Sequence, residues 1–197
     1  MHYLAGAGDG QTPLDADEAA DLIPSWVATR ADLDRVEQDG IVQTMAWARG
    51  RRLRAHDILS EPFVRQLHKR MFGDAWKWAG HYRTTNKNIG VDRAYIIEEI
   101  AKLIADARYW VDENSFAADE TAVRLHHKLA WIHPFPNGNG RHARLAADLL
   151  IGTLGGTQFT WGEELADDSE VARREYIAAL READAGNIAP LVAFARR

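Results

Sequence analysis

The chain contains no cysteine, so disulfide bonds, thiolate metal ligands and a cysteine nucleophile are excluded. It also lacks any apolar run of about 18 residues, the length that a membrane-spanning helix needs. The first residues, MHYLAGAGDGQTPLDADEAADLIP, show no basic segment followed by an apolar one, so no signal peptide is expected. These absences predict a protein of the reducing cytoplasm that has no membrane partner.

Positive charge is in short supply as well. The 24 Lys and Arg residues are outnumbered by 29 Asp and Glu residues, and the formal net charge is −5. A general nucleic-acid-binding role is therefore not expected, and the basic run RGRRLR at 49–54 is interpreted as a solvated helix end. This balance still allows a local basic pocket for a small polyanion. Apolar residues make up 46% of 197 positions, which is ordinary for one globular domain.

Helical periodicity and capping residues dominate what is present. Thr29, with Asp32 three residues later, predicts the start of a long helix, and Ser60 predicts the start of another that ends at Gly73. In the second helix, Phe63, Leu67 and Met71 fall on one core-facing side. Further helices are predicted near 15–24, from about Tyr95 with Ile97, Ile100, Leu103 and Ile104 as its apolar positions, over about 118–132 and 139–154, and from Ser169 to Gly186.

The pattern changes after Gly73. The segment DAWKWAGHYRTTNKNIGVD at 74–92 alternates imperfectly and carries aromatic residues, threonines and a turn-forming Asn-Lys-Asn-Ile-Gly sequence. This favours a short hairpin or extended excursion. The expected fold class is therefore mainly α, a helical bundle with a small β-hairpin, in a single domain whose first 12 or so residues form a loose tail.

The segment IHPFPNGNGRHAR at 132–144 carries the chemistry. Pro134 and Pro136 exclude a continuous helix, while Gly138 and Gly140 allow backbone angles that other residues resist. The bend therefore precedes a new helix, whose first amides form a natural anion site. Arg141 and Arg144 in the first turns oppose the helix dipole. Their position is understandable if an anion such as a phosphate binds between them.

His133 stands directly before this bend. As a neutral imidazole near pH 7 it could take a proton from an attacking hydroxyl, but it is equally well placed to end the preceding helix. Asn137 is a turn residue or, beside bound phosphates, an oxygen ligand of Mg²⁺. Phe135 is predicted to be a core residue that fixes the loop.

Other phosphate and metal motifs fit poorly. No P-loop sequence is present, and the dinucleotide-like spacing of Gly138, Gly140 and Ala143 follows a predicted helix where that motif needs a strand. A metal-dependent hydrolase would have to use His56 with Asp57, or the adjacent pair at 126–127. Adjacent residues on a helix point in different directions, which disfavours a shared metal ion.

Residues 133–144, His-Pro-Phe-Pro-Asn-Gly-Asn-Gly-Arg-His-Ala-Arg, match the signature His-x-Phe-x-Asp/Asn-Gly-Asn-Gly-Arg-x-x-Arg of the Fic family. The segments LHKRMFGDAWKWAGHYR at 67–83 and REYIAALREADAGNIAPLVAF at 174–194 also resemble Fic sequences. The whole chain resembles the Fic subgroup called mobile mystery protein B. The resemblance implies a Fic-type core over about 53–155 and C-terminal helices over about 168–197.

By this resemblance, the protein is a protein adenylyltransferase that transfers AMP from Mg²⁺-bound ATP to a Ser, Thr or Tyr hydroxyl of a target protein. His133 would be the base and Asn137 the Mg²⁺ ligand. Amides of the glycine bend would bind the phosphates and two arginines would clamp them, and a flap would dock the target by strand addition. The amides are those of Gly138, Asn139 and Gly140, the clamp is Arg141 and Arg144, and the flap is Thr84, Thr85, Asn86, Lys87, Asn88, Ile89, Gly90 and Val91.

Several alternatives stay open at this point. Tyr176 lies near the adenine or is a helix-face core residue. The same fold also includes enzymes that phosphorylate a target or remove AMP, and a catalytically idle binding module is the non-enzymatic alternative. Many Fic proteins carry an inhibitory helix with the pattern Ser/Thr-x-x-x-Glu-Gly/Asn, and no segment here matches, since Glu37 has Leu33 four residues before it. Unless a degenerate version operates, the chain is expected to be uninhibited or restrained by a separate protein, as a toxin is by its antitoxin.

Overall fold

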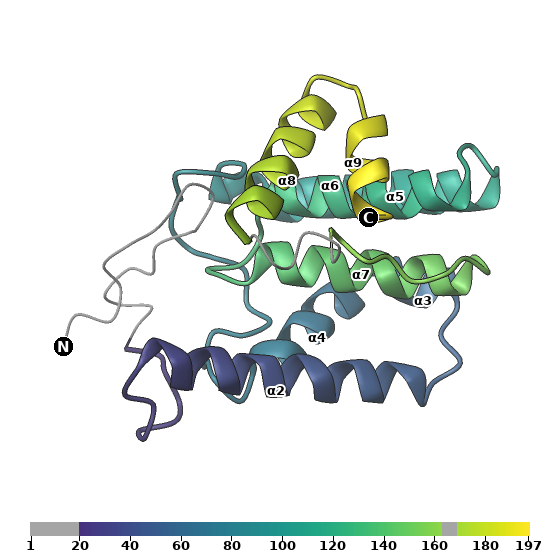
Figure 1. The fold of residues 1–197 in the computed structure, drawn as a ribbon. Helices are drawn as coiled ribbons and strands as arrows, with labels where there is room; N and C mark the ends of the chain where they lie inside the picture. Colours follow the sequence, from purple (N-terminus) through teal and green to yellow (C-terminus); the bar gives the residue numbers. More distant parts are fainter. Residues whose placement is uncertain (1–19, 163–168) are drawn as a thin grey trace.

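The computed structural model describes residues 20–162 and 169–197, and these are mainly helical (Figure 1). The helices are α2 (Arg30–Arg49), α3 (Ala55–Ile58), α4 (Glu61–Phe72), α5 (Ile96–Asp112), α6 (Ala118–Ile132), α7 (Asn139–Thr153), α8 (Ser169–Asp184) and α9 (Ala189–Ala195), and a 3₁₀ turn, η1 (Arg93–Tyr95), precedes α5. The predicted helical fold is confirmed, and the helix that begins at residue 118 ends at residue 132 as the sequence indicated.

Helix α7 lies in the centre of the molecule (Figure 1). In the figure α5 and α6 run above it, α3, α4 and α2 lie below it, and α8 and α9 cover the upper layer. Small and apolar residues on several sides of α7 are fully or almost fully buried, among them Ala143, Ala147, Leu150 and Ile151. A helix that is buried on most sides belongs in the middle of a bundle, and this position fixes where the start of α7, with its glycine bend, lies.

Capping interactions explain where two of the lower helices begin. The Thr29 hydroxyl accepts a hydrogen bond from the Asp32 amide at 3.1 Å, and the Asp32 carboxylate accepts one from the Thr29 amide at 2.8 Å. This reciprocal pair is the capping box that the sequence predicted. The hydrogen bonds from Thr29 and from nearby amides hold the pKa of Asp32 below its ordinary value. At α4, the Ser60 hydroxyl accepts from the Phe63 amide at 3.4 Å.

Of the two alternatives predicted for residues 74–92, the hairpin was wrong, and one apolar position of α5 is exposed. Between α4 and η1 the described chain forms turns and irregular backbone where a hairpin was expected, and its one bridge joins Trp76 to Leu22. Alternating residues therefore produced an extended loop without a strand ladder. Ile97, expected on the buried side of α5, is 71% exposed. The predicted helix near 15–24 falls partly outside the described residues, and residues 20–24 are not helical.

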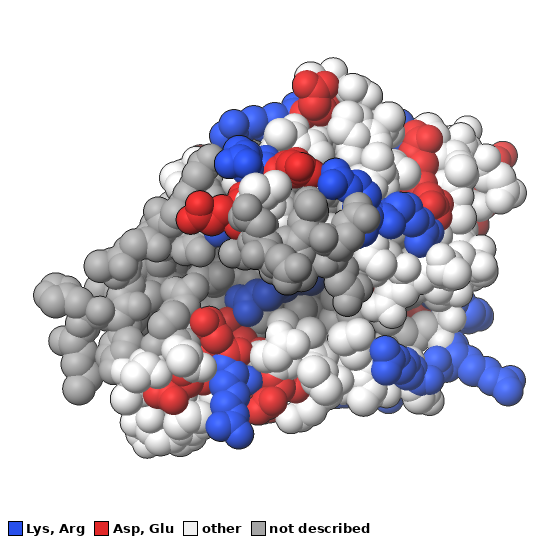
Figure 2. All heavy atoms as spheres, viewed as in Figure 1, with Lys and Arg blue, Asp and Glu red and all other residues white. Residues whose placement is uncertain are grey.

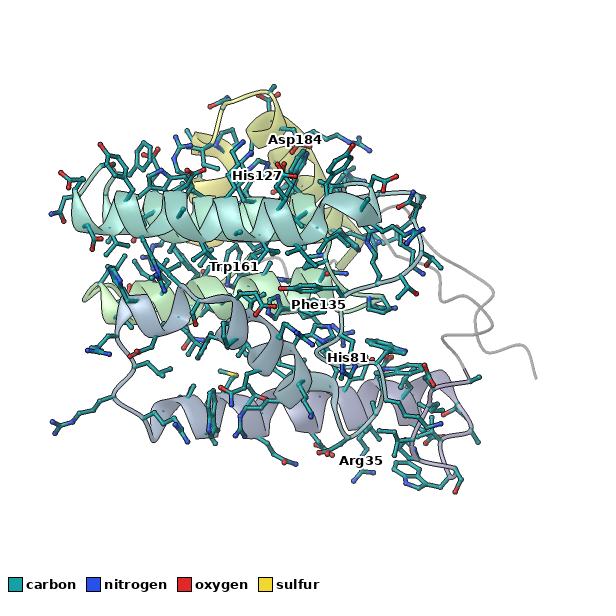
Figure 3. The ribbon with its side chains drawn as sticks, turned by 180° about the vertical axis from the view of Figure 1, so that it is seen from behind. Arg35, His81, His127, Phe135, Trp161 and Asp184 are labelled. Carbon is teal, nitrogen blue, oxygen red and sulfur yellow. The ribbon has the colours of Figure 1, made fainter. Side chains whose placement is uncertain are left out.

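Side-chain interactions join the C-terminal part of the chain to α6. Nε2 of His127 on α6 lies 2.8 Å from the carboxylate of Asp184 on α8, and the two side chains point toward one another in Figure 3. Arg196 forms an ion pair with Asp119 at the start of α6. None of the helices in the described ranges, 20–162 and 169–197, combines the length and apolar character that crossing a bilayer requires.

Candidate active site at the start of helix α7

Gly138 is the residue that turns the chain into α7. Its φ of 76° lies in the left-handed region, and a Cβ built on it would come within 2.6 Å of the Phe72 ring. Both the backbone angle and the close approach of α4 therefore require glycine here. Because Gly138 occupies the N-cap position and has no side chain to offer, the first amides of α7 receive no side-chain cap. Such amides are suited to bind an anion.

Gly140 differs from Gly138 in what surrounds it. A Cβ at this position would meet only the Tyr176 hydroxyl, at 3.9 Å. Neither folding nor packing thus demands glycine at 140, which lies one residue into α7. The lack of a side chain here leaves the backbone open to close approach by a ligand.

Asn139 and His68 hold the bend from inside. The Asn139 side chain accepts from the Phe135 amide at 2.9 Å and donates to the Phe135 carbonyl at 2.8 Å. Phe135, labelled in Figure 3, is fully buried, as predicted, and its ring centroid lies 3.7 Å from that of the stacked His68 ring. His68 accepts from the Gly80 amide through Nδ1, so its Nε2 carries the proton and donates to the Asn137 carbonyl at 3.0 Å. Burial lowers the pKa of His68 well below its usual value and keeps the ring neutral.

The Asn137 side chain is half-buried and turned toward the bend. Its Oδ1 accepts from the Gly138 amide at 2.6 Å. The predicted metal-ligand oxygen and one of the predicted anion-binding amides therefore contact each other in this structure. A neutral amide oxygen is a suitable ligand for Mg²⁺ that also binds substrate phosphates. Asn137 could supply that ligand after rotating away from the Gly138 amide, which would be released for an anion at the same time.

Arg141 is held by an acidic residue from α2. Its Nη1 lies 2.7 Å from Oε2 of Glu37, and its guanidinium packs over the Phe72 ring at 4.8 Å. The other oxygen of Glu37 accepts from the Trp76 indole N–H at 2.7 Å, and Glu37 is only 5% exposed. A carboxylate thus already pairs with one of the two cations that sequence reasoning assigned to phosphates.

Arg144 turns to the other side of α7. Its guanidinium lies over the Tyr176 ring of α8 at 5.4 Å, and the Tyr176 hydroxyl lies 3.0 Å from Nε2 of His126. The two arginines therefore extend toward α2 and α8 from the first turns of α7. Figure 2 shows Lys and Arg atoms in a hollow on this face of the molecule, with Asp and Glu atoms beside them. An anion at the start of α7 would lie between the two guanidinium groups.

His133 combines both roles that its position suggested. It terminates α6 in the left-handed conformation, with φ 54°, and its amide donates to Leu129. Its ring is mostly buried, and Nδ1 lies 3.3 Å from the Ala130 carbonyl. Because a carbonyl only accepts, Nδ1 carries the proton in the neutral ring and Nε2 keeps the lone pair. Burial lowers the pKa of His133 to about 4, and the positive charges of Arg83 and Lys87 act in the same direction.

The predicted flap, residues 84–91, lies against His133. A Cβ on Gly90 would approach the His133 Cβ to 2.5 Å, and Gly90 has a φ of 92°. The Arg83 side chain, 4% exposed, donates to the carbonyls of His133, Thr85 and Val91. Within the flap, the Asn86 side chain contacts the residues that follow it: its Nδ2 donates to the Asp92 carboxylate and its Oδ1 accepts from the Arg93 amide.

The histidines of the rival metal site do not converge. His126 contacts Tyr176, whereas its neighbour His127 contacts Asp184. His56 pairs with Asp112 at 2.8 Å. Within residues 20–162 and 169–197, no three His, Asp or Glu side chains are grouped so that they could hold a metal ion.

Residues 58–151 match the Fic/DOC family. The chain carries a Fic domain. Protein adenylyltransferase fic-1 of Caenorhabditis briggsae is 33% identical over 143 residues, which are 71% of this chain and 27% of that protein. Probable protein adenylyltransferase y4lH of Sinorhizobium fredii is 28% identical over 175 residues, 83% of this chain and 85% of the relative.

The solved structures agree with this assignment. Fic-1 from C. elegans superimposes on the Fic domain with a TM-score of 0.67 and 26% identity, and the match covers 91% of this chain and 51% of that one. The chain thus spans about half of the solved nematode protein and a smaller share of the C. briggsae relative. The subgroup named from the sequence, mobile mystery protein B, stays a prediction.

Sequence reasoning missed three residues of this site. Glu37 was set aside because its surroundings departed from the inhibitory pattern, yet it pairs with Arg141. Arg83 and His68 lie in the segment 67–83 that resembles Fic sequences, but no role was predicted for either residue. A buried guanidinium and a buried imidazole near a glycine bend are not visible as a motif, because their partners are backbone atoms far along the chain.

Proposed function

We propose that this Fic domain transfers AMP from ATP to a hydroxyl group of a target protein. The observation that carries the proposal is the pairing of a neutral His133 with the uncapped start of α7, six residues further along the chain. The first can take a proton and the second can bind phosphates. The names of the two sequence relatives, both protein adenylyltransferases, support the same activity.

The chain's own groups account for each part of the reaction. Nε2 of His133 takes the proton of the target hydroxyl while the oxygen of that hydroxyl attacks the α-phosphorus of ATP. The bond between the α-phosphorus and the bridging oxygen breaks, and pyrophosphate leaves. Amides at 138–140, with Arg141 and Arg144, would bind the phosphate oxygens and stabilise their charge as it shifts. Mg²⁺ bound to the phosphates, with Asn137 as a protein ligand, would neutralise part of that charge.

Intact glycines favour nucleotidyl transfer over the kinase-like alternative. The position of Gly138 cannot accept a side chain, and nothing but a hydroxyl lies near Gly140, so the bend keeps its full anion-binding surface. Removal of AMP from a target and an idle binding module are the remaining alternatives. A protein that only binds a partner has no need for a base whose ring nitrogen is oriented by Ala130.

Replacing each of the two glycines with alanine tests the phosphate-binding role. Gly140→Ala should fold normally, with a stability equal to or up to about 1 kcal/mol above that of the wild type, because alanine favours a helix. It should nevertheless weaken ATP binding and AMP transfer at least about tenfold, since the added methyl group faces the ligand. Calorimetric binding of ATP and thermal unfolding, measured on one preparation, check both statements.

Gly138→Ala is the matched control in that experiment. It places a methyl group within 2.6 Å of the Phe72 ring in a left-handed backbone, so it should lower the melting temperature as well as binding. Equal ATP affinity in Gly140→Ala and wild type would count against an anion site at the start of α7.

Control of the enzyme from within the chain is also part of the proposal. Glu37 occupies Arg141, so the domain carries its own acidic competitor for a phosphate-binding cation. A toxin restrained by an antitoxin is the alternative, with a cytoplasmic protein as target. Growth arrest on expression of Glu37→Gln but not of the wild type would favour internal restraint. If the wild type arrests growth and co-expression of the product of a neighbouring gene relieves the arrest, the alternative of a toxin with a separate antitoxin is favoured.

A further inference from the structure

Three consecutive carbonyls at the end of α6 find their partners at the two ends of the flap. The last carbonyls of a helix lack partners inside it. Here the Val91 amide donates to Ile132 at 3.3 Å, the Arg83 side chain donates to His133 at 2.7 Å, and the Arg83 amide donates to Pro134 at 2.9 Å. The backbone at and around His133 is therefore held by residues at the two ends of the flap, and Arg83 supplies two of these three hydrogen bonds.

The same guanidinium also joins the two ends of the flap. Its Nη1 donates to the Thr85 carbonyl at 2.9 Å and its Nη2 donates to the Val91 carbonyl. A hairpin would hold its ends together by cross-strand hydrogen bonds, which this segment lacks. The planar guanidinium, with donors in fixed directions, takes their place.

The charge of Arg83 is tolerated in this buried position for a physical reason. All of the side-chain bonds above go to backbone carbonyls, and burial lowers the pKa of Arg83 without neutralising it. The guanidinium lies at the C-terminus of α6, where the helix dipole attracts a cation. That dipole and the carbonyls offset the cost of burial.

The conformation of His133 makes this support necessary. A left-handed backbone is uncommon for a residue other than glycine and persists where its surroundings hold it. Gly90, whose missing Cβ lets the flap touch the His133 side chain, adds a contact from the opposite side.

We infer that Arg83 is a positioning residue that holds the flap and the His133 ring as one unit. A target segment docked on the flap then meets the base in a fixed placement. This inference rests on the proposed function for its catalytic meaning, but its geometric content stands on the contacts of Arg83 alone.

Four variants of the full chain separate the parts of this inference. Arg83→Lys keeps the positive charge but loses the planar group with its several donors in fixed directions, and Arg83→Gln loses both the charge and that group. Asp92→Ala, at an exposed residue just outside the flap, removes the carboxylate that accepts from Asn86 and leaves Arg83 intact. Arg93→Gln removes a cation from an exposed position next to the flap and serves as the matched control. Each is examined by hydrogen exchange over 84–91, by NMR titration of the His133 ring, by ADP binding, and by transfer of label from α-labelled ATP to lysate proteins.

Both Arg83 variants should show exchange in the flap at least about tenfold faster than wild type. Label transfer should fall at least about tenfold, because a small displacement of the base is costly, while ADP binding changes less than about twofold. Burial is the main cause of the low pKa of His133, and Arg83 and Lys87, the charged groups that face it, lower this pKa further. Arg83→Gln should therefore also raise the pKa of His133, whereas Arg83→Lys should not. Asp92→Ala should speed exchange yet keep transfer and titration near wild type, and Arg93→Gln should change nothing.

Wild-type transfer in Arg83→Lys would overturn the inference, and so would an equal loss of transfer in Asp92→Ala, which would show that flap order alone matters. If the Arg83 variants fail to fold, hydrogen exchange of the wild type decides: the Val91 amide, which donates to Ile132, should be protected, and exchange of this amide at the rate of an unfolded chain would overturn the inference. If wild type transfers no label, the proposed function fails, while exchange and titration still decide whether Arg83 couples the flap to His133.

Discussion

Replacing His133 with alanine is expected to lower AMP transfer by about a hundred- to ten-thousand-fold, the usual contribution of a positioned general base. Nucleotide binding should be almost unchanged, because the proposed phosphate site consists of amides of α7 with Arg141 and Arg144 and does not include His133. The measurement compares transfer of label from α-labelled ATP with calorimetric ADP binding in the same variant. His56→Ala is the control, since His56 is paired with Asp112 on the surface.

The pH dependence gives this prediction a second test. The pKa of His133 is lowered to about 4, so the ring stays neutral and able to accept a proton at every pH well above that value. The acid side of the kcat/KM profile, which reports the free enzyme, should therefore stay flat from about pH 8 down to about pH 5.5. An ordinary histidine would lose half of its activity near pH 6.5. A loss centred there would contradict the buried, neutral state of His133.

Replacing Glu37 with glutamine is expected to raise activity. The carboxylate competes with phosphates for Arg141 and also repels them, and a charge-assisted hydrogen bond of this kind contributes roughly 1.5–3 kcal/mol. Its loss should tighten ATP binding roughly ten- to hundredfold, and AMP transfer should rise in parallel. Glutamine keeps the oxygen that accepts from Trp76, so that contact survives.

Stability should change in the opposite direction. Without the ion pair the free energy of unfolding should fall by about 1–3 kcal/mol, so Glu37→Gln gains activity and loses melting temperature. Glu120→Gln is the matched control, because it also removes a glutamate–arginine pair, with Arg124 on α6. Glu37→Gln that binds ATP no better than wild type would show that Arg141 is not a phosphate ligand.

Local signals explain how much of this fold the sequence could predict. Three of these signals act within a few residues and are therefore readable in the sequence: the capping box at Thr29, the serine before α4, and the glycine at 138 that turns the chain into α7. The glycine bend is readable for the same reason, while the phosphate-binding role of its arginines stays a prediction. The flap conformation could not, because alternating residues are compatible with a strand ladder and with an extended loop. The Arg83 guanidinium, whose bonds to Thr85 and Val91 replace a ladder, is not visible as a pattern in the sequence.

Tertiary contacts account for the rest. Glu37 and Arg141 are 104 positions apart, and the packing of α2 against α4, which in turn packs against α7, brings them together. A scan for a fixed local pattern could not find Glu37, because the pairing depends on where its carboxylate lies. Ile97 shows the opposite case, in which helical spacing was right but the helix turned that residue toward solvent.

The most direct test of the central claim is the fate of the two ends of ATP. Glu37→Gln, the variant expected to be most active, is incubated with Mg²⁺ and lysate proteins, once with α-labelled and once with γ-labelled ATP. The proposed function predicts that the α label becomes attached to protein, that the γ label is released as pyrophosphate, and that adding His133→Ala abolishes the transfer. Attachment of the γ label instead would show a kinase and contradict the assignment of the glycine bend.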